Sequence, residues 1–476
     1  MLRRKEVRFL LNDEQVILKN ISPSLSLLDF LRLERGLCGT KEGCNEGDCG
    51  ACTILVGRLV DEQLTYEAVN ACIRFVPSLD GMHIITIEHL KPSDKELHPV
   101  QKALVKYHGS QCGFCTPGIA MSLYGLWLQN PFPKQEEIKI ALQGNLCRCT
   151  GYAPIIRAAL AISKQGDLAN DFLHKQRQTI IKNLQKINEG AQVEVISEAG
   201  EFYIPKTIDD LALLYADKPK ATLLAGSTDI GLWVNVEHRN ISPVIFIGNI
   251  AELKEIKQGK DALIIGAGIT YSQAREAFAK HFSFLADFLT NIGGTQVRNM
   301  GTIGGNIANG SPIGDMAPPL IALGASLHLQ QGNKHRKILL EDFYIAYGKQ
   351  DLQQSEFIKS IEIPYIKPNE LVVVYKVSKR KYEDISTLCA AFKLEIKNEI
   401  ITKSILAYGG MAAKPSRAKR AEKQLLDEPI SQKIFDKAAL VLSDDFSPIN
   451  DVRASADYRM LVAQNLLKKF YLEQCS

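Results

Sequence analysis

The stretch Gly109-Ser-Gln-Cys-Gly-Phe-Cys-Thr-Pro-Gly118 decides the fold of the first third of this chain. It carries a CxxC pair, and a second cysteine pair, split by a single arginine, follows in Gly144-Asn-Leu-Cys-Arg-Cys-Thr-Gly-Tyr152. The four thiols of these pairs are Cys112, Cys115, Cys147 and Cys149. Two closely spaced cysteine pairs predict a metal site.

Each pair is expected just before the N-terminus of a helix. Pro117 suits a first helical turn, because the N–H that it lacks would have no partner there. A second helix is predicted over 134–143, with Gly144 as a left-handed cap, and a third after Ala153. Helix N-termini stabilise anions, and a cluster of iron, sulfide and thiolates is anionic. This arrangement favours an iron–sulfur cluster.

A second set of four cysteines lies upstream with a more diagnostic spacing. Cys44-x4-Cys49-x2-Cys52, with Cys72 further on, is the plant-type 2Fe-2S pattern. Three glycines in this loop permit positive φ and let backbone N–H groups turn toward the sulfurs. They are Gly43, Gly47 and Gly50. The strand–helix–loop–strand order around the loop predicts a β-grasp ferredoxin fold.

The alternative for both sets is structural zinc on a scaffold without enzymatic activity. The single residue Arg148 between the last two thiols argues against zinc, whose paired ligands usually leave two to four residues between them. A visible spectrum separates the two readings, because iron–sulfur clusters and flavin are coloured and zinc is not.

The composition is that of a folded protein of roughly three domains over 476 residues. A net charge of +4 without a basic stripe gives no reason to expect nucleic-acid binding. No apolar run reaches the length of a membrane span or of a signal-peptide core, so we expect a soluble, cytoplasmic protein. Cys38, Cys389 and Cys475 fall outside both cysteine sets, and reduced thiols are expected throughout.

The N-terminal third also carries patterns for its secondary structure. Alternating apolar residues predict a β-hairpin over 5–19, and an amphipathic helix over 26–34 follows with Ser26 as its cap. Four helical patterns over 92–164 predict a small bundle. The polar segment 165–197 is interpreted as a linker with some helix.

From residue 198 the sequence changes to an α/β pattern. Thr222–Asp229 predicts a strand that runs into a turn of small residues. Gly266-Ala-Gly268 begins like a dinucleotide-binding fingerprint, but Tyr271 occupies the third glycine position, so the fingerprint fails. The glycine-rich stretch 293–315 either lies against a pyrophosphate or is an ordinary surface loop.

Residues 366–476 predict a separate α+β unit. Strands are expected over 371–376, 386–396 and 401–407, followed by helices near 416–426, 431–442 and 454–472. The charged loop Lys379–Asp384 between two of the strands is interpreted from its composition as a solvated turn.

In combination, five motifs resemble the molybdenum hydroxylases over nearly the whole chain, and within that family the small subunits of bacterial xanthine dehydrogenases. They are Gly43–Cys52, Gly109–Gly118, Gly144–Tyr152, Leu224–Asp229 and Thr302–Ile307 with Asp315. The resemblance implies two 2Fe-2S clusters and one FAD, held by a multidomain α+β fold.

The implied domains are a β-grasp plant-type 2Fe-2S ferredoxin domain (1–90), a helical-bundle 2Fe-2S domain (91–165), a linker (166–197), a two-subdomain FAD-binding domain of the vanillyl-alcohol-oxidase type (198–365) and a C-terminal α+β flavoprotein domain (366–476).

Carried over by position, the resemblance also implies the residues that contact FAD. The FAD phosphates would lie against Leu223, Leu224, Ala225, Gly226, Ser227, Thr228, Asp229 and Ile230. The pyrophosphate and ribitol would contact Thr302, Ile303, Gly304, Gly305 and Asn306, the adenosine end would contact Asp315, and two further flavin contacts are Ile358 and Lys376. The metal ligands would be Cys44, Cys49, Cys52 and Cys72 for one cluster, and Cys112, Cys115, Cys147 and Cys149 for the other.

Four further positions match functional places in the family. Ile292 stands where some relatives stack an aromatic residue on the flavin. Loop 379–384 matches the loop near the flavin that separates NAD-using from oxygen-using forms. Gln111 and Cys149 match positions that face the pterin of the molybdenum cofactor.

The resemblance implies an electron-transfer role in purine oxidation. The molybdenum-pterin cofactor would lie on a large partner subunit, in a heterotetramer with two copies of each chain. Electrons would pass from it through the helical-domain cluster and the plant-type cluster to FAD, and then to NAD⁺, as hypoxanthine or xanthine is oxidised. The alternatives are the same role for an aldehyde or another N-heterocycle, and a stand-alone NADH diaphorase.

Overall fold

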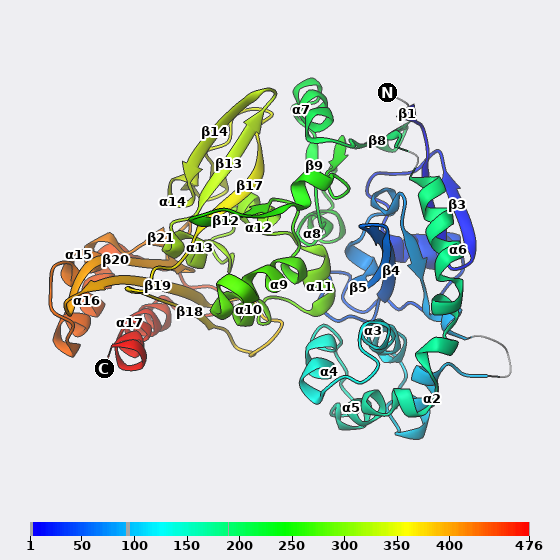
Figure 1. Cartoon of the computed structure of the whole chain (residues 1–476), viewed down its shortest axis with the longest axis horizontal. Coiled ribbons are helices and arrows are strands. Elements are labelled where there is room, and N and C mark those ends of the chain that lie inside the picture. The colour runs from blue at the N-terminus through cyan, green and yellow to red at the C-terminus, as the bar shows by residue number, and fades with distance from the viewer. Residues whose placement is uncertain (1–2, 92–95, 189, 476) are drawn as a thin grey trace. The chain divides into compact units, whose positions relative to one another are not determined.

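The computed structural model describes residues 3–91, 96–188 and 190–475 (Figure 1). The chain divides into two compact units. The first comprises Met1–Ile250 and Gly293–Gly301, and the second comprises Ala251–Ile292 and Thr302–Ser476. The short segment 293–301 therefore belongs with the first unit, although both of its sequence neighbours belong to the second. In the part of the chain that the structure describes, every helix is too short or too polar to cross a membrane.

The first unit begins with a five-stranded sheet in the order β3-β2-β6-β4-β5. Its strands are β2 (Val7–Leu11), β3 (Glu14–Leu18), β4 (Thr53–Val60), β5 (Gln63–Asn70) and β6 (His83–Ile85). β2 and β6 run parallel, and the other neighbours are antiparallel. The predicted hairpin over 5–19 is confirmed.

The predicted helix over 26–34 is confirmed as a helical segment with two geometries. α1 (Leu27–Asp29) continues into a π-helical turn over Phe30–Glu34. Ser26 Oγ accepts a hydrogen bond from the Asp29 N–H, so the predicted cap is present.

Four helices follow, as predicted: α2 (Pro99–Lys106), α3 (Thr116–Gln129), α4 (Gln135–Ala141) and α5 (Ala153–Leu160). The left-handed cap predicted at Gly144 is wrong, because α4 ends at Ala141 with the right-handed Leu142 as its cap. Gly144 is required for another reason. A Cβ at this position would lie 2.0 Å from the Oε1 atom of Gln296.

The segment 165–197, interpreted as a linker with some helix, forms regular structure instead. It contains α6 (Phe172–Ile187), whose N-cap Asp171 accepts hydrogen bonds from two backbone N–H groups, and β7 (Gln192–Ser197). α6 buries an apolar stripe against β2, β4 and β5, made of Leu173, Ile180, Ile181, Leu184 and Ile187. The helical spacing of this stripe was hidden by the polar residues between its members.

A second sheet of the first unit has the order β1-β7-β8-β10-β9. It contains β1 (Arg3–Arg4), β8 (Gly200–Ile204), β9 (Thr222–Leu224) and β10 (Val244–Phe246) beside β7. α7 (Ile208–Asp217) and α8 (Ile230–Asn235) follow β8 and β9. The strand predicted from Thr222 is confirmed, whereas the pairing of β1 with β7 was not predicted.

The second unit contains an antiparallel sheet in the order β11-β12-β17-β13-β14. Its strands are β11 (Ile256–Gln258), β12 (Ala262–Gly266), β13 (Ser326–Gln331), β14 (Lys334–Leu339) and β17 (Phe357–Pro364). Around it lie α9 (Tyr271–His281), α10 (Ser283–Leu289), α12 (Ile303–Asn309), α13 (Ala317–Leu323), α14 (Leu340–Phe343) and the pair β15 (Tyr344–Ala346) and β16 (Lys349–Gln350).

The glycine-rich stretch 293–315 is therefore not a simple surface loop. It forms α11 (Thr295–Met300) in the first unit and α12 in the second. Thr302 begins α12 as its N-cap, because its Oγ1 accepts a hydrogen bond from the Gly305 N–H at 3.0 Å.

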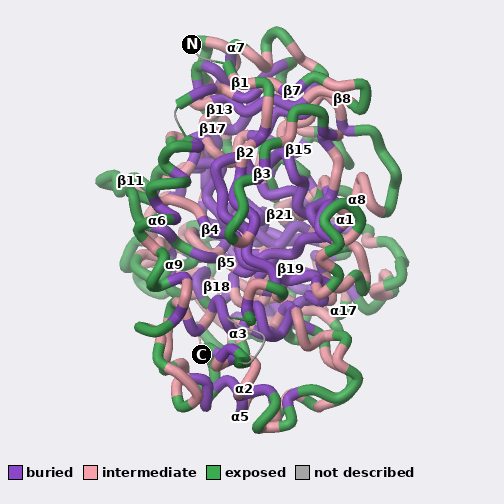
Figure 2. The backbone as a smooth tube through the Cα atoms, turned by 90° about the vertical axis from the view of Figure 1, so that its right-hand side faces the viewer, coloured by how far each residue is buried: buried purple, intermediate pink, exposed green. Residues whose placement is uncertain are grey.

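The C-terminal part of the second unit is an antiparallel sheet covered by helices, as predicted. Its strands are β18 (Glu370–Val377), β19 (Leu388–Lys397), β20 (Ile400–Gly409) and β21 (Ser416–Arg417), and its helices are α15 (Lys419–Leu425), α16 (Gln432–Asp445) and α17 (Ala456–Gln474). β19 lies in the buried part of the tube in Figure 2, and its first seven residues are buried.

Candidate functional site: two thiol sets and a divided flavin-binding region

The four cysteines of the plant-type set come together in the first unit. Cys52 Sγ lies 3.4 Å from Cys72 Sγ, and the Cys44 thiol forms hydrogen bonds with both Cys49 and Cys72. Those contacts from Cys49 and Cys72 hold the pKa of Cys44 far below its usual range. A thiolate is the form that ligates a metal. All four sulfurs are free thiols.

The backbone of this loop turns toward the sulfurs. The N–H groups of Glu46 and Cys49 each lie 3.4 Å from Cys44 Sγ. Gly47 and Gly50 have φ of +82° and +67°, as predicted. Gly43 has no positive φ, and it is required because a Cβ there would lie 2.7 Å from Cys49 Sγ. Such N–H donors are the groups that tune the potential of a thiolate-bound cluster.

The second set of cysteines also converges, in two hydrogen-bonded pairs. Cys112 contacts Cys149, and Cys115 contacts Cys147, each through side-chain hydrogen bonds. Burial and the hydrogen bond with Cys147 raise the pKa of Cys115 to about 12. Cys115 is the N-cap residue of α3, so the expected place before a helix N-terminus is confirmed for this thiol.

The loop before Cys149 is held by a side chain that sequence reasoning missed. The Cys147 N–H donates to the Tyr152 hydroxyl at 2.8 Å, and that hydroxyl donates to the Asn145 carbonyl at 3.2 Å. Gln111 and the outer pair, Cys112 and Cys149, are exposed. An exposed edge is where a cluster could exchange electrons with another redox centre.

Within the described ranges, no group of three or more His, Cys, Asp and Glu side chains is arranged to hold one metal ion. Both thiol sets are instead linked as sulfur pairs, and a 2Fe-2S cluster binds two protein ligands on each iron. The thiols present therefore fit binuclear clusters.

The predicted FAD residues are divided between the two units. Leu223–Ile230 lies in the first unit, as the end of β9 and the turn into α8. Leu224 is fully buried in the core, and Ser227 Oγ donates to the Ile73 carbonyl at 2.6 Å. These two side chains are therefore committed to the protein, and Leu223, Ala225 and Thr228 stay partly accessible.

The helix that follows this turn is bonded to the backbone of the plant-type cysteine set. Asn235 Nδ2, at the end of α8, donates to the carbonyls of Cys72 and Asn45, each at 2.9 Å. Gly231 permits the close approach, because a Cβ there would lie 2.7 Å from the Ile73 Cβ. The turn assigned to the flavin phosphates and a predicted cluster ligand thus share one hydrogen-bonded region.

The remaining predicted FAD residues lie in the second unit. Thr302–Asn306 form the cap and first turn of α12, and Gly305 is exposed there. Gly304 is required for packing, because a Cβ would lie 2.5 Å from the Ala267 Cβ. Asn306 Oδ1 is buried and has no hydrogen-bond partner among the described residues. An unpartnered buried acceptor of this kind fits a polar ligand.

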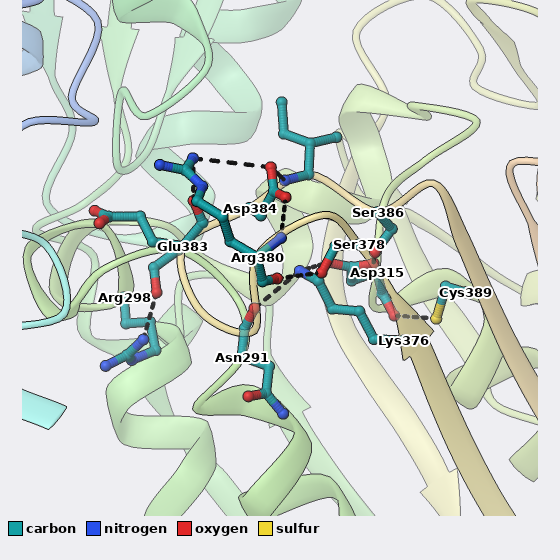
Figure 3. A network of polar contacts seen from close by, with 12 residues as sticks. Asn291, Arg298, Asp315, Lys376, Ser378, Arg380, Glu383, Asp384, Ser386 and Cys389 are labelled. Carbon is teal, nitrogen blue, oxygen red and sulfur yellow. Dashed lines mark hydrogen bonds and ion pairs between the residues drawn. The ribbon is translucent and has the colours of Figure 1, made fainter. Parts of the chain in front are cut away.

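Asp315 and Lys376 form a buried ion pair rather than two separate contacts (Figure 3). Lys376 Nζ lies 2.8 Å from Asp315 Oδ2 and also donates to the Asn291 carbonyl at 2.8 Å. The other carboxylate oxygen of Asp315 accepts from Ser386 Oγ. Both oxygens of the carboxylate are thus engaged within the second unit. Ile358 is buried in the core of the same unit.

Cys389, beside this pair, is an unreactive thiol. It is fully buried, and burial together with the charge of Asp315 raises its pKa well above the usual value. Its Sγ lies 3.8 Å from the Asp315 carbonyl oxygen. It behaves as a small apolar residue.

A hollow of about 680 Å³ adjoins Lys376 in the second unit. α10, β18 and the loop after β18 line it, including Phe288, Asn291, Arg380 and Lys381. Its volume is that of a small-molecule site. The loop 379–384, interpreted as a solvated turn, is braced within itself, because the Arg380 N–H donates to Asp384 at 2.8 Å and its guanidinium to the Glu383 carbonyl at 2.9 Å.

Three family models match successive parts of the chain. A [2Fe-2S] binding domain matches residues 86–160, a FAD binding domain in molybdopterin dehydrogenase matches 196–366, and a CO dehydrogenase flavoprotein C-terminal domain matches 373–474. The chain thus carries a 2Fe-2S domain and an FAD-binding domain.

Curated relatives are similar over nearly the full length of this chain. Xanthine dehydrogenase of Drosophila subobscura is 31% identical over 98% of the chain and 39% of the relative. That of Dictyostelium discoideum is 31% identical over 93% of the chain and 38% of the relative. The chain therefore spans about two fifths of the length of these relatives.

A solved structure matches more than half of the chain. A chain of carbon monoxide dehydrogenase from Hydrogenophaga pseudoflava is 25% identical with a TM-score of 0.54, over 57% of this chain and 95% of its own length. Together with the three domain matches and the two converging thiol sets, these similarities show that the chain carries a 2Fe-2S domain and an FAD-binding domain and is similar to proteins of the molybdenum hydroxylase family.

Proposed function

We propose that this chain is the iron–sulfur/flavin subunit of a xanthine dehydrogenase of the bacterial, multi-subunit kind. Its partner would be a large molybdenum-cofactor subunit, in a cytoplasmic heterotetramer with two copies of each chain. Support comes from xanthine dehydrogenases that align with 98% of this chain. A solved carbon monoxide dehydrogenase chain also matches 57% of this chain over 95% of its own length.

The proposed cofactors would supply stepwise electron transfer: two 2Fe-2S clusters and FAD would carry electrons from molybdenum to NAD⁺. This chain would hold one cluster in a β-grasp ferredoxin domain and the other in a helical bundle. FAD would lie in a two-subdomain domain of the vanillyl-alcohol-oxidase type.

The residues of the first unit support a continuous path. Leu146 N–H donates to the Cys49 carbonyl at 3.0 Å, which joins the loop of one thiol set to the loop of the other. Asn235 joins Cys72 to the helix that follows the flavin-binding turn. These two hydrogen bonds are the main support for the proposal, because electron transfer requires redox sites that lie close together and are held rigidly.

In the second unit, Asn306 would offer its free carbonyl oxygen to the flavin, and Lys376 would bring a positive charge held in place by Asp315. We propose that the 680 Å³ hollow beside Lys376 accepts NAD⁺ and that Arg380 and Lys381 face its phosphates. Loop 379–384 would then decide between NAD⁺ and oxygen.

The Cys49→Ala variant tests this proposal in the assembled complex. Cys49 carries a predicted ligand sulfur that alanine lacks, so the plant-type EPR signal and the reduction of NAD⁺ by xanthine should both disappear, while the backbone carbonyl that contacts Leu146 is kept. Cys38→Ala is the matched control, because Cys38 is exposed and lies outside both thiol sets. NADH formation that survives the Cys49→Ala change at the wild-type rate would contradict the proposal.

Two alternatives have their own tests. A substrate screen with NAD⁺ separates purines from aldehydes and other N-heterocycles. Co-purification with a large molybdenum subunit decides against a stand-alone NADH diaphorase.

A further inference from the structure

Gln296 lies at the centre of a buried polar cluster in the first unit, and its side chain is inaccessible to solvent. Its Nε2 donates to Asn145 Oδ1 at 2.9 Å and lies 3.1 Å from both Thr53 Oγ1 and Ser122 Oγ. The residue comes from α11, on the short segment 293–301. A glutamine from the flavin-binding part of the sequence thus reaches into the iron–sulfur region of the same unit.

The hydroxyl protons of this cluster are used elsewhere. Thr53 Oγ1 donates to the Gly50 carbonyl at 2.7 Å, and Ser122 Oγ donates to Asn145 Oδ1 at 2.6 Å. Asn145 Nδ2 donates to the Gly50 carbonyl at 3.1 Å. Three oxygen atoms therefore face position 296 as acceptors. Because a donor must stand opposite them, the NH2 group of the Gln296 amide, and not its carbonyl oxygen, points toward them.

The three acceptors belong to the elements that carry the predicted cluster ligands. Thr53 directly follows Cys52, Asn145 lies two residues before Cys147, and Ser122 lies on α3, whose N-cap is Cys115. These elements meet the Gln296 amide over sequence separations of 243, 151 and 174 residues. The amide is thus a single point at which both cysteine loops are fixed.

The carbonyl oxygen of the same amide distinguishes this position from an ordinary packed core position. Gln296 Oε1 is buried without a hydrogen-bond partner among the described residues, a situation that native proteins rarely keep. Gly144 leaves room for this oxygen atom, because any side chain at Gly144 would collide with Oε1. Two further contacts hold the segment in place: Thr295 Oγ1 donates to the Ile140 carbonyl at 2.6 Å, and Arg298 donates to Gln143 at 2.7 Å.

We propose that Gln296 is a positioning residue for electron transfer between the two clusters. By adding a shared donor to Thr53, Ser122 and Asn145, it reinforces the direct Asn145–Thr53 hydrogen bond, keeps the Leu146–Cys49 hydrogen bond formed and fixes the separation and coupling of the two thiol sets. This inference rests on the proposed function for its purpose, but the positioning itself is a property of this chain.

The main test is the Gln296→Met variant, which keeps the side-chain length and removes the donor. Hydrogen exchange should become about tenfold faster in the peptide that contains the Leu146 amide, because the cluster loses the donor that Thr53, Ser122 and Asn145 share. In the dithionite-reduced protein, the low-temperature EPR splitting from coupling between the two clusters should change, while the iron content stays at the wild-type level.

The matched control is Gln129→Met, the same chemical change at an exposed position of α3 whose amide donates to the Tyr66 carbonyl. This control should alter neither the exchange rate at Leu146 nor the EPR splitting. Ser122→Ala provides a second route if Gln296→Met does not fold. It should change the EPR splitting in the same direction, and non-additively with Gln296→Met, because both residues act on Asn145.

Unchanged exchange at Leu146 and unchanged splitting in both variants would overturn the inference. That result is distinct from failure of the proposed function, which would show as wild-type protein without any 2Fe-2S signal. The exchange measurement remains decisive in that case.

Discussion

The Lys376–Asp315 pair joins two residues that are predicted to contact FAD. The two charged side chains are only 5% and 9% exposed. Removing one partner of a buried ion pair leaves the other charge without compensation, which costs about 3–5 kcal/mol. We therefore expect Lys376→Met to lower the stability of the second unit by about that amount, measured by urea unfolding of flavin-free protein.

Lys337→Met is the matched control, because Lys337 forms an ion pair of the same 2.8 Å length with Glu362 while 49% of its side chain is exposed. An exposed pair of this kind contributes at most about 1 kcal/mol. Equal losses in the two variants would show that burial of the Asp315 charge has no energetic consequence.

His83 gives a second prediction, which concerns pH. It is buried, contacts the Tyr66 hydroxyl and the Asn12 carbonyl at 2.7 Å each, and burial lowers its pKa to about 4. Between pH 6.5 and pH 4 the unfolded chain takes up a proton that the folded chain does not. Stability should therefore fall across this window as pH decreases, by about 3 kcal/mol in total.

The measurement is urea unfolding of wild type and His83→Gln at several pH values in that window. The His83→Gln variant should lose this part of the pH dependence. The control is His174→Gln, at an exposed position of α6. If the stability of the His83→Gln variant fell with decreasing pH as steeply as that of wild type, the lowered pKa assigned to His83 would be contradicted.

At the scale of elements, α6 is the clearest departure from the sequence-based prediction. Its cap, Asp171, accepts hydrogen bonds from the Leu173 N–H and from the Tyr124 hydroxyl, and it pairs with His98 at 3.1 Å. Asp171→Ala should destabilise the first unit by about 2–4 kcal/mol, because a helix cap and a buried charge network are lost together.

Thermal unfolding of the first unit measures this effect. Asp167→Ala is the control, since Asp167 caps only a short 3-10 turn. If α6 were the linker that its composition indicates, the two variants would behave alike.

The elements that were predicted share one property: their signals are local. The hairpin over 5–19, the four helices after residue 98 and the strands after residue 370 follow from periodicity, proline and caps over a few residues. The glycine-rich stretch was harder, because α11 and α12 are each short and the N-cap of Thr302 shows only in the folded geometry.

At the scale of the whole molecule, the two cysteine sets could be predicted and their connections could not. The spacing of Cys44, Cys49 and Cys52 is itself a signature. Asn235 contacts Cys72 across 163 positions of the sequence, and Gln296 contacts Thr53 across 243 positions. No periodic pattern encodes contacts of this length. The division of the predicted FAD residues between the two units likewise appears only in the fold.

The central claim is that this chain holds two 2Fe-2S clusters and one FAD. The most direct measurement is an anaerobic dithionite titration of freshly purified protein, followed by EPR with iron, acid-labile sulfide, zinc and flavin analysis. The account predicts two distinct 2Fe-2S signals, equal amounts of iron and sulfide, and stoichiometric FAD. Colourless protein that contains zinc in place of iron and sulfide would contradict it.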